Sequence, residues 1–310
     1  MIISRMKTIK LILIFLLAIT FFCCKNETET NDKLKVVTTT TMITDLVKNI
    51  GGDYIEVEGL MGSGVDPHLY KASEGDVSKL VNTNVIFYNG LHLEGKLVEV
   101  FEKMGNTNKT QVALGESLDK SLLIGSDYFA SNYDPHVWFN IGFFKHFTQQ
   151  VTKTLSDKDP KNTANFAENQ KLYLAKLTQL ETEISTVINT LPKHKRILVT
   201  AHDAFNYFGK NYDFNVVGLQ GLSTAAEAGV KDVQKLSSFI VKNKIKAIFV
   251  ESSVPKRTIE ALVAAVKAKD HEVIIGGTLY SDALGNAGTV EGSYIGMFKY
   301  NVNTIVNALK

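Results

Sequence analysis

The stretch NFAENQKLYLAKLTQLETEISTVINTL, residues 165–191, runs for 27 residues without a glycine or a proline. Its leucine, isoleucine and valine residues recur at helical spacing, and a proline stands before and after it, at Pro160 and Pro192. At ~1.5 Å per residue, such a helix would be about 40 Å long, which is enough to cross an entire small domain. The stretch therefore predicts one long helix that joins two parts of the chain.

Outward from this helix, short apolar segments alternate with amphipathic ones. The strand-like segments are rich in β-branched and aromatic residues, as expected of strands covered on both faces. Before the long helix, strands are predicted at 34–41, 54–60 and 84–90, and helices at 42–50 and 94–105. After it, strands are predicted at 196–202, 214–219, 246–253 and 271–277, and helices at 230–244, 256–269 and 294–310.

Strands that alternate with helices favour mostly parallel sheets with helices on both faces. The predicted fold class is therefore α/β, with two lobes joined by one rigid helix and a binding site in the cleft between the lobes. The boundaries we expect are an N-terminal lobe at 34–164, a linking helix at 165–191 and a C-terminal lobe at 192–310. Because the connector is rigid, we expect ligand binding to cause small lobe shifts rather than wide closure.

The first 24 residues have the layout of an export signal. Three basic residues precede an apolar run of 14 residues, from Leu11 to Cys24, which is shorter than the roughly 18 residues expected of a membrane-spanning helix. The polar residues 25–33 then form a flexible tether to the folded part. This layout predicts an exported protein.

Both cysteines of the chain lie at the end of this signal, so no disulfide is expected within the fold. A cysteine in this position is typical of a lipoprotein, whose thiol is acylated after cleavage. Cys24 is the preferred site because cleavage would then follow a small residue, and Cys23 is the alternative. Phe21 and Phe22 differ from the usual small residues before such a site. A plain apolar role for both thiols stays open.

The charge of the chain excludes one class of partner. The formal net charge is +2, but removal of Arg5, Lys7 and Lys10 with the signal leaves one more acidic than basic residue. At 45% hydrophobic and 21% charged residues, the composition is ordinary for a globular protein. No basic surface for nucleic acid is predicted.

The triplet Asp-Pro-His occurs twice, at 66–68 and at 134–136, in a chain with only five prolines and seven histidines. Proline fixes its own backbone and biases the preceding aspartate towards an extended conformation, so each triplet holds its histidine in a defined direction. Two histidines presented alike, His68 and His136, suit a shared metal ion. A structural role for either histidine remains an equal alternative at this point.

Two residues of the second lobe are further candidates. His202 ends a predicted strand, and Asp282 follows another strand and its turn. Ligand-contacting groups of open α/β sheets lie at the carboxyl ends of the strands. Taken singly, His202 could be a polar residue at a helix start, and Asp282 could be a turn former.

Six segments together resemble a known family, the metal-binding lipoproteins of bacterial ABC importers for zinc and manganese, of the TroA-like branch (periplasmic solute-binding protein family 9). The resemblance covers about residues 34–310, including the long helix. The segments are GVDPHLY (64–70), DPHVW (134–138), VTAHDAFNYFG (199–209), GLQGLSTAAEAG (218–229), AIFVESSVP (247–255) and GGTLYSDALG (276–285).

The resemblance implies a function and a ligand set. It implies that His68, His136, His202 and Asp282 bind one divalent metal, Zn²⁺ or Mn²⁺, between the lobes. It also implies delivery of that metal to a membrane permease driven by a cytoplasmic ATPase. The expected protein is a monomer, anchored by lipid to a membrane and facing the periplasm or the cell exterior, and not an enzyme. Three imidazoles and a carboxylate leave no open position for a reacting water, which favours capture over catalysis.

Zinc is the first choice of metal, manganese the second and iron a more distant third. Nitrogen-rich coordination favours zinc, whereas manganese prefers oxygen. The chain departs from both specialised types of the family. The segment before His136 lacks the histidine-rich loop of dedicated zinc proteins, and His202 stands where manganese-selective relatives often have a glutamate.

Two other functions are weighed against this one. A zinc hydrolase would need an open coordination position and a general base, for which Glu251 is the best candidate. A siderophore or haem binder would need an aromatic or cationic pocket between the lobes. The remaining acidic candidates near the ligands, expected to orient imidazoles or attract cations, are Asp66, Asp134, Asp203 and Glu251. The histidines interpreted as structural or solvated are His92, His146, His194 and His271.

Overall fold

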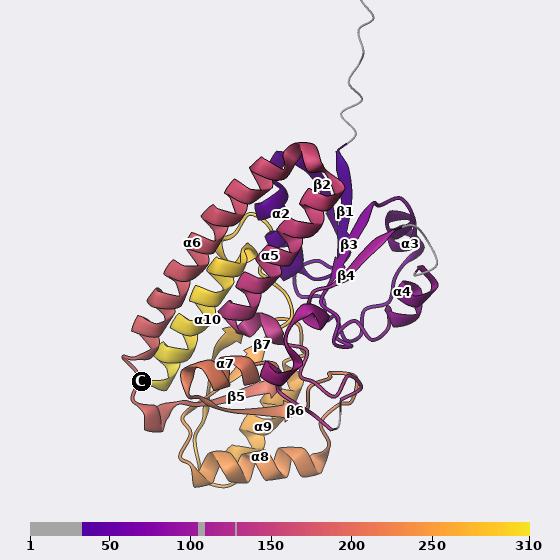
Figure 1. Ribbon diagram of the computed structural model, residues 1–310. Coiled ribbons are helices and arrows are strands. Elements are labelled where there is room, and N and C mark those ends of the chain that lie inside the picture. Colours follow the sequence, from indigo (N-terminus) through magenta and orange to yellow (C-terminus); the bar gives the residue numbers. More distant parts are fainter. Residues whose placement is uncertain (1–32, 105–108, 128) are drawn as a thin grey trace, which may run out of the picture. The chain divides into compact units, whose positions relative to one another are not determined.

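The structure is a computed structural model that describes residues 33–104, 109–127 and 129–310 (Figure 1). The predicted export signal, both cysteines and residues 25–32 of the predicted tether lie outside the described residues. No helix within the described ranges has the length and apolar character needed to cross a membrane.

The first sheet comes from the chain before the long helix. Its four strands are all parallel, in the order β2-β1-β3-β4. Helices pack on it because their apolar residues point inwards: α2, for example, buries Met42, Leu46 and Ile50. The strands are β1 (Leu34–Thr38), β2 (Ile55–Gly59), β3 (Val85–Tyr88) and β4 (Thr110–Ala113), and the helices are α2 (Thr41–Gly51), α3 (Glu74–Val81), α4 (Val98–Met104) and α5 (Ile141–Lys158).

The second group of strands follows the long helix and is also parallel. β5 pairs with β6, β7 pairs with β8, and β5 lies against β7. The strands are β5 (Ile197–His202), β6 (Asn215–Gln220), β7 (Ala247–Glu251) and β8 (Ile274–Leu279), and the helices are α7 (Asn206–Tyr212), α8 (Val230–Lys242), α9 (Arg257–Lys267) and α10 (Tyr294–Leu309). Short 3₁₀ turns lie at 52–54, 115–117, 120–122, 137–139, 160–162, 193–195 and 290–292.

The predicted long helix is α6 (Thr163–Ile188), which begins two residues earlier and ends three residues earlier than expected. It packs against α2, α5 and α10, and Figure 1 shows it running beside α5 and α10. Its buried face includes Tyr173, Leu177 and Ile184. The predicted fold class, an α/β protein with mostly parallel sheets and one long helix, is confirmed.

Aromatic residues that precede α6 in the sequence and aromatic residues that follow it pack in one core. Phe144 of α5 and Tyr294 of α10 stack face to face, with ring centroids 3.7 Å apart and ring planes within 7° of parallel. Phe139 and Phe205 meet at 4.4 Å. Because these pairs join the chain before α6 to the chain after it, residues 34–310 form one compact unit.

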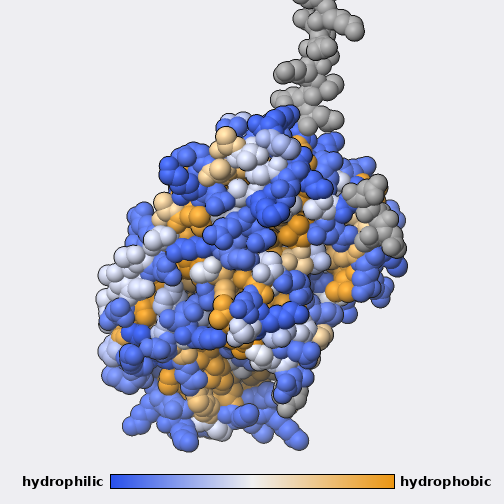
Figure 2. Space-filling model, viewed as in Figure 1, coloured by the Kyte–Doolittle hydropathy of each residue, from blue (hydrophilic) through white to orange (hydrophobic). Residues whose placement is uncertain are grey.

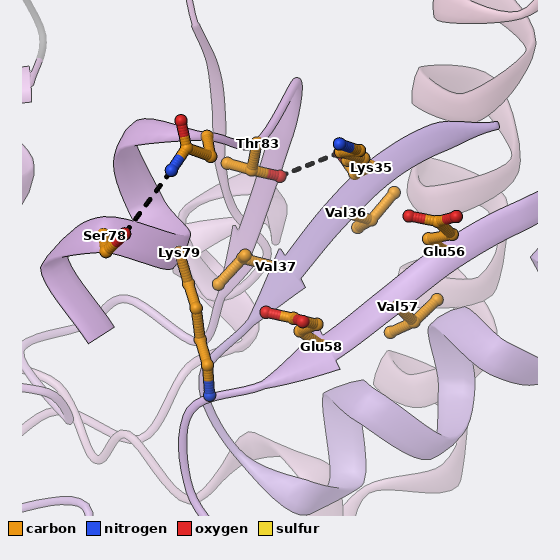
Figure 3. Close-up of a pocket in the computed structure, with 10 residues that line it drawn as sticks. Lys35, Val36, Val37, Glu56, Val57, Glu58, Ser78, Lys79 and Thr83 are labelled. Atoms are coloured by element: carbon orange, nitrogen blue, oxygen red, sulfur yellow. Dashed lines mark hydrogen bonds between the residues drawn. The ribbon is translucent and has the colours of Figure 1, made fainter. Parts of the chain in front are cut away.

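The surface seen in Figure 2 is mainly hydrophilic, with apolar residues in separate patches. One hollow, of about 520 Å³, is lined by residues of β1 and β2 and by residues at the end of α3. Figure 3 shows Lys35, Glu56 and Glu58 on β1 and β2, with Lys79 of α3 beside them. None of the predicted metal ligands lines this hollow.

Candidate metal centre

Four side chains that are far apart in the sequence meet in a buried cluster, which we call the quartet. Each offers one ligand atom, and the four atoms all lie within 4.8 Å of one another. All four residues are at most 5% exposed, and three are at most 1% exposed. The quartet consists of His68, His136, His202 and Asp282.

The fold brings the quartet together at strand ends. His68 lies in the loop after β2, His202 is the last residue of β5, and Asp282 lies three residues beyond the end of β8. His136 directly precedes the 3₁₀ turn at 137–139. Since parallel strands present their carboxyl ends at one edge, loops of distant sequence converge there.

The two Asp-Pro-His triplets form the same local turn. The backbone N–H of His68 donates to Asp66 Oδ1 at 2.9 Å, and that of His136 donates to Asp134 Oδ1 at 2.9 Å. An aspartate that accepts the N–H two residues ahead closes a turn with its own side chain. This shared turn is the reason that one stiff triplet serves both histidines.

Two carboxylates orient imidazoles of the quartet. Asp134 Oδ1 lies 2.7 Å from Nδ1 of His136, and Glu251 Oε2 lies 2.6 Å from Nδ1 of His202. Such contacts hold the opposite nitrogen towards a metal. Accordingly, His136 Nε2 lies 3.3 Å from His68 Nε2, and His202 Nε2 lies 3.3 Å from an oxygen of Asp282.

The other two candidate carboxylates contact backbone and hydroxyl groups instead. Asp66 accepts from the hydroxyl of Thr224 at 2.6 Å, besides the His68 N–H. Asp203 accepts the backbone N–H of Gly218 at 2.7 Å and so joins the residue after β5 to β6. Of the four candidates, Asp134 and Glu251 are therefore the two that contact an imidazole of the quartet.

The chain matches a known family of metal-binding proteins over nearly its whole described length. The family model described as zinc-uptake complex component A, periplasmic, matches residues 36–308. The chain belongs to this family. The resemblance to the TroA-like metal-binding proteins is thereby confirmed.

Individual relatives match this chain over most of its length. The manganese-binding lipoprotein MntA of Bacillus subtilis is 46% identical over 280 residues, which cover 90% of this chain and 91% of the relative. The zinc-binding protein TroA of Treponema pallidum is 46% identical over 274 residues, 88% of each chain. The solved structure of periplasmic TroA from the same organism superposes with a TM-score of 0.87, covering 89% of this chain and 99% of that one.

Burial and neighbouring charges shift the pKa values of three quartet residues in different directions. Burial lowers the pKa of His68 to about 3, so its imidazole is neutral. Burial would also lower the pKa of His202, but the neighbouring Glu251 and Asp282 carboxylates outweigh it and raise that pKa well above its ordinary value. Burial alone would raise the pKa of Asp282, yet His202 holds it well below the usual range. Asp282 is therefore an anion at neutral pH.

Several buried polar atoms of the quartet lack a hydrogen bond. Among the described residues, both ring nitrogens of His202 and Oδ1 of Asp282 have no hydrogen-bond partner, and His202 Nε2 and Asp282 Oδ1 are the two that lie on the side of the other ligands. Buried polar groups are normally paired, and an uncompensated one costs free energy. A bound cation would satisfy His202 Nε2 and Asp282 Oδ1, so this donor set fits a divalent metal.

The other histidines lie apart from the quartet. His146 Nε2 is 3.1 Å from the hydroxyl of Ser117, and His271 Nε2 is 2.8 Å from the carbonyl of Ile245. His92 is exposed, with its ring 6.2 Å from that of Phe129, and His194 lines a separate surface hollow.

Sequence reasoning missed several residues around the quartet. The indole N–H of Trp138 donates to the carbonyl of Ser281 at 3.0 Å, beside Asp282, and Ser253 donates to Asp282 Oδ2 at 3.1 Å. Asn206 and Tyr207 both contact Asp134. A signal for each was present, because every one of them lies within the six segments that carry the family resemblance.

Proposed function

We propose that this protein is the substrate-binding component of a bacterial ABC importer. It captures one divalent transition metal outside the cytoplasm and delivers it to a membrane permease driven by a cytoplasmic ATPase. Membership of the zinc-uptake component A family supports this role, as do the metal-binding relatives. The metal is the transported substrate and not a resident cofactor.

The observation that carries the proposal is the buried convergence of the quartet. Three imidazoles and one carboxylate, with ligand atoms within 4.8 Å of one another, match the size and chemistry of a four-coordinate metal shell. In this proposal the metal ligands are His68, His136, His202 and Asp282.

Zinc is the proposed first substrate and manganese the second, with iron more distant. Three nitrogen ligands favour zinc. The names of the relatives do not decide between the two metals, because a manganese-binding and a zinc-binding protein are equally similar to this chain. Zinc would also bind more tightly than manganese in a titration whatever the cell transports. The metal content of protein purified from its native host is the measurement that separates them.

Capture without catalysis is the proposed activity. A hydrolase would need a free general base beside the metal, and Glu251 was the best candidate for one. Both of its oxygens face His202, one at the imidazole and one at the backbone N–H. Glu251 therefore serves as an orienting group in this proposal.

We further propose that the protein is exported as a monomer and anchored by lipid on Cys24, or alternatively Cys23, facing the periplasm or the cell exterior. The name of MntA, a lipoprotein, supports the anchor. The lobes remain proposed at 34–164 and 192–310, joined by the long helix α6. Mass spectrometry of the native N-terminal peptide tests the anchor: a Cys24→Ala variant that keeps its lipid would move the site to Cys23.

Calorimetric titration with zinc tests the main proposal. The wild-type protein should bind one zinc ion per chain, and His202→Ala should lose most of the affinity. His146→Ala, a histidine outside the quartet, is the matched control and should bind as the wild type does. Unchanged affinity in His202→Ala would refute the ligand assignment.

A further inference from the structure

Helix α7, which follows β5, contacts the second Asp-Pro-His triplet directly. The side-chain amide of Asn206 donates to Asp134 Oδ2 at 3.0 Å. The hydroxyl of the next residue, Tyr207, donates to the backbone carbonyl of Asp134 at 3.1 Å. Both contacts join residues more than 70 positions apart in the sequence. Asn206 and Tyr207 follow closely after His202, the last residue of β5.

We propose that Asn206 is a positioning residue for metal binding, which fixes the orientation of the His136 imidazole through Asp134. This inference rests on the proposed function, because it takes His136 as a metal ligand. Helix α7 contains no proposed metal ligand, yet this inference gives it a part in the metal site.

The inference rests on the different contacts that the two carboxylate oxygens of Asp134 make. Oδ1 contacts His136 twice, at the backbone N–H and at Nδ1, whereas Oδ2 receives the Asn206 amide. The Asp134 side chain is fully buried. If the amide is removed, Oδ2 becomes a buried charged oxygen that has lost its donor, which is costly. Rotation of the carboxylate relieves that cost, and the rotation moves the oxygen on which the imidazole depends.

Tyr207 complements Asn206 by holding the backbone in place. Its ring is buried, and its hydroxyl accepts the backbone N–H of Ile124 at 3.1 Å while it donates to the Asp134 carbonyl. The tyrosine therefore anchors the position of the Asp134 backbone. Rotation of the Asp134 side chain is left to Asn206.

The Asn206–Asp134 contact couples two proposed ligands, His136, which precedes α6 in the sequence, and His202, which follows it. His202 ends β5, and Asn206 begins α7 four residues later. A shift of this segment that displaces His202 also withdraws the amide from Asp134 and frees His136. We expect the two imidazoles to loosen together, so that the Asn206 contact acts chiefly on the rate of metal release.

The experiment measures release of zinc from the loaded protein into an excess of chelator. Asn206→Ala and Asn206→Asp, which is similar in size but lacks the amide donor, should each release zinc about tenfold to a hundredfold faster than the wild type. The visible spectrum of the cobalt-loaded variants should also change, because it reports ligand geometry. Asn211→Ala is the control on the same helix: its amide lies near Phe139 and Asn140, not Asp134.

A double-mutant cycle separates this role from a general effect on folding. In an Asp134→Ala background, Asn206→Ala should cause no further acceleration, since the side chain that accepts the amide is then absent. Thermal melting of the metal-free proteins checks that both variants at Asn206 are folded. If the alanine variant is unfolded, the release rate and the cycle are measured with the aspartate variant.

Wild-type release rates and cobalt spectra in both Asn206 variants would overturn the inference. A full effect of Asn206→Ala in the Asp134→Ala background would overturn it as well, because the amide would then act elsewhere. In either case the wild type still binds zinc and the proposed function stands. A wild-type protein that holds neither zinc nor cobalt would instead remove the proposed function together with this inference.

Discussion

Glu251 contacts His202 at two points: Oε1 accepts the backbone N–H of His202 at 2.9 Å, and Oε2 lies 2.6 Å from its imidazole Nδ1. A single carboxylate at the end of β7 thus fixes both the backbone and the ring of a residue at the end of the adjacent strand β5. The ring therefore keeps Nε2 directed at Asp282 before any metal arrives.

We expect Glu251→Gln to weaken zinc binding by about tenfold to a hundredfold, because the amide replaces the carboxylate that contacts the His202 imidazole. Calorimetric titration measures the affinity. Glu260→Gln, an exposed position on α9, is the control and should leave it unchanged. An affinity of Glu251→Gln equal to that of the wild type would show that the contact does not orient a ligand.

Zinc affinity should fall as the pH falls. The raised pKa of His202 means that the metal-free protein carries a proton there at neutral pH, and zinc must displace it. Below that pKa the apparent association constant should drop by up to about tenfold per pH unit. His68, whose pKa burial lowers to about 3, adds no further proton to this exchange.

Titrations between about pH 6 and about pH 8 measure this dependence, and buffers of different ionisation enthalpy report the proton released. A constant affinity and no proton release across this interval would contradict the protonated state of His202.

Leu177→Ala should destabilise the protein by about 2–5 kcal/mol, since this leucine of α6 is fully buried and its loss leaves a cavity. Leu172→Ala on the same helix is the matched control. Leu172 is 52% exposed, so its substitution should change the free energy of unfolding by at most about 0.5 kcal/mol. Denaturant unfolding of the metal-free protein compares the two, and equal effects would argue against the described burial of α6.

Metal binding should change the dimensions of the protein only slightly. Glu181 and Glu183 of α6 form ion pairs with Lys145 of α5 and Lys299 of α10, at 2.8 Å and 2.6 Å, and the aromatic core also spans both sides of the helix. Small-angle scattering of metal-free and zinc-loaded protein should give radii of gyration within about 1 Å of each other. A large compaction would contradict a rigid connector.

Much of the fold could be predicted from the sequence where local pattern and tertiary packing agree. The strand at 197–202 and the long helix carry apolar residues at the spacing that their burial requires. The helix predicted at 94–105 is shorter, α4 at Val98–Met104. Glu94, the first residue of the predicted helix, lies before α4, is buried and accepts the backbone N–H groups of Asn89 and Gly90. Those contacts form a turn that local propensity does not encode.

The same limit applies to the site. The repeated triplet and the strand ends pointed to His68, His136, His202 and Asp282 as candidates, and the fold brings all four together. The sequence could not separate Asp134 and Glu251 from Asp66 and Asp203. Asp66, Asp134 and Asp203 each lie within two residues of a candidate histidine, and Glu251 ends a strand far from every candidate ligand along the chain. Only the directions of the side chains distinguish those that face a ring. Helix α7 begins at Asn206, and the Asp203 side chain before it accepts the backbone N–H of Gly218 instead of contacting a ring.

The stacked rings of Phe144 and Tyr294 bear on protein engineering in this family. A chimera that exchanged everything after α6 for the equivalent part of a relative would set a foreign α10 against the native α5 and divide a single aromatic contact between two parents. Transplants of metal specificity should therefore carry α5 along with the second group of strands, although α5 lies on the other side of the long helix in the sequence.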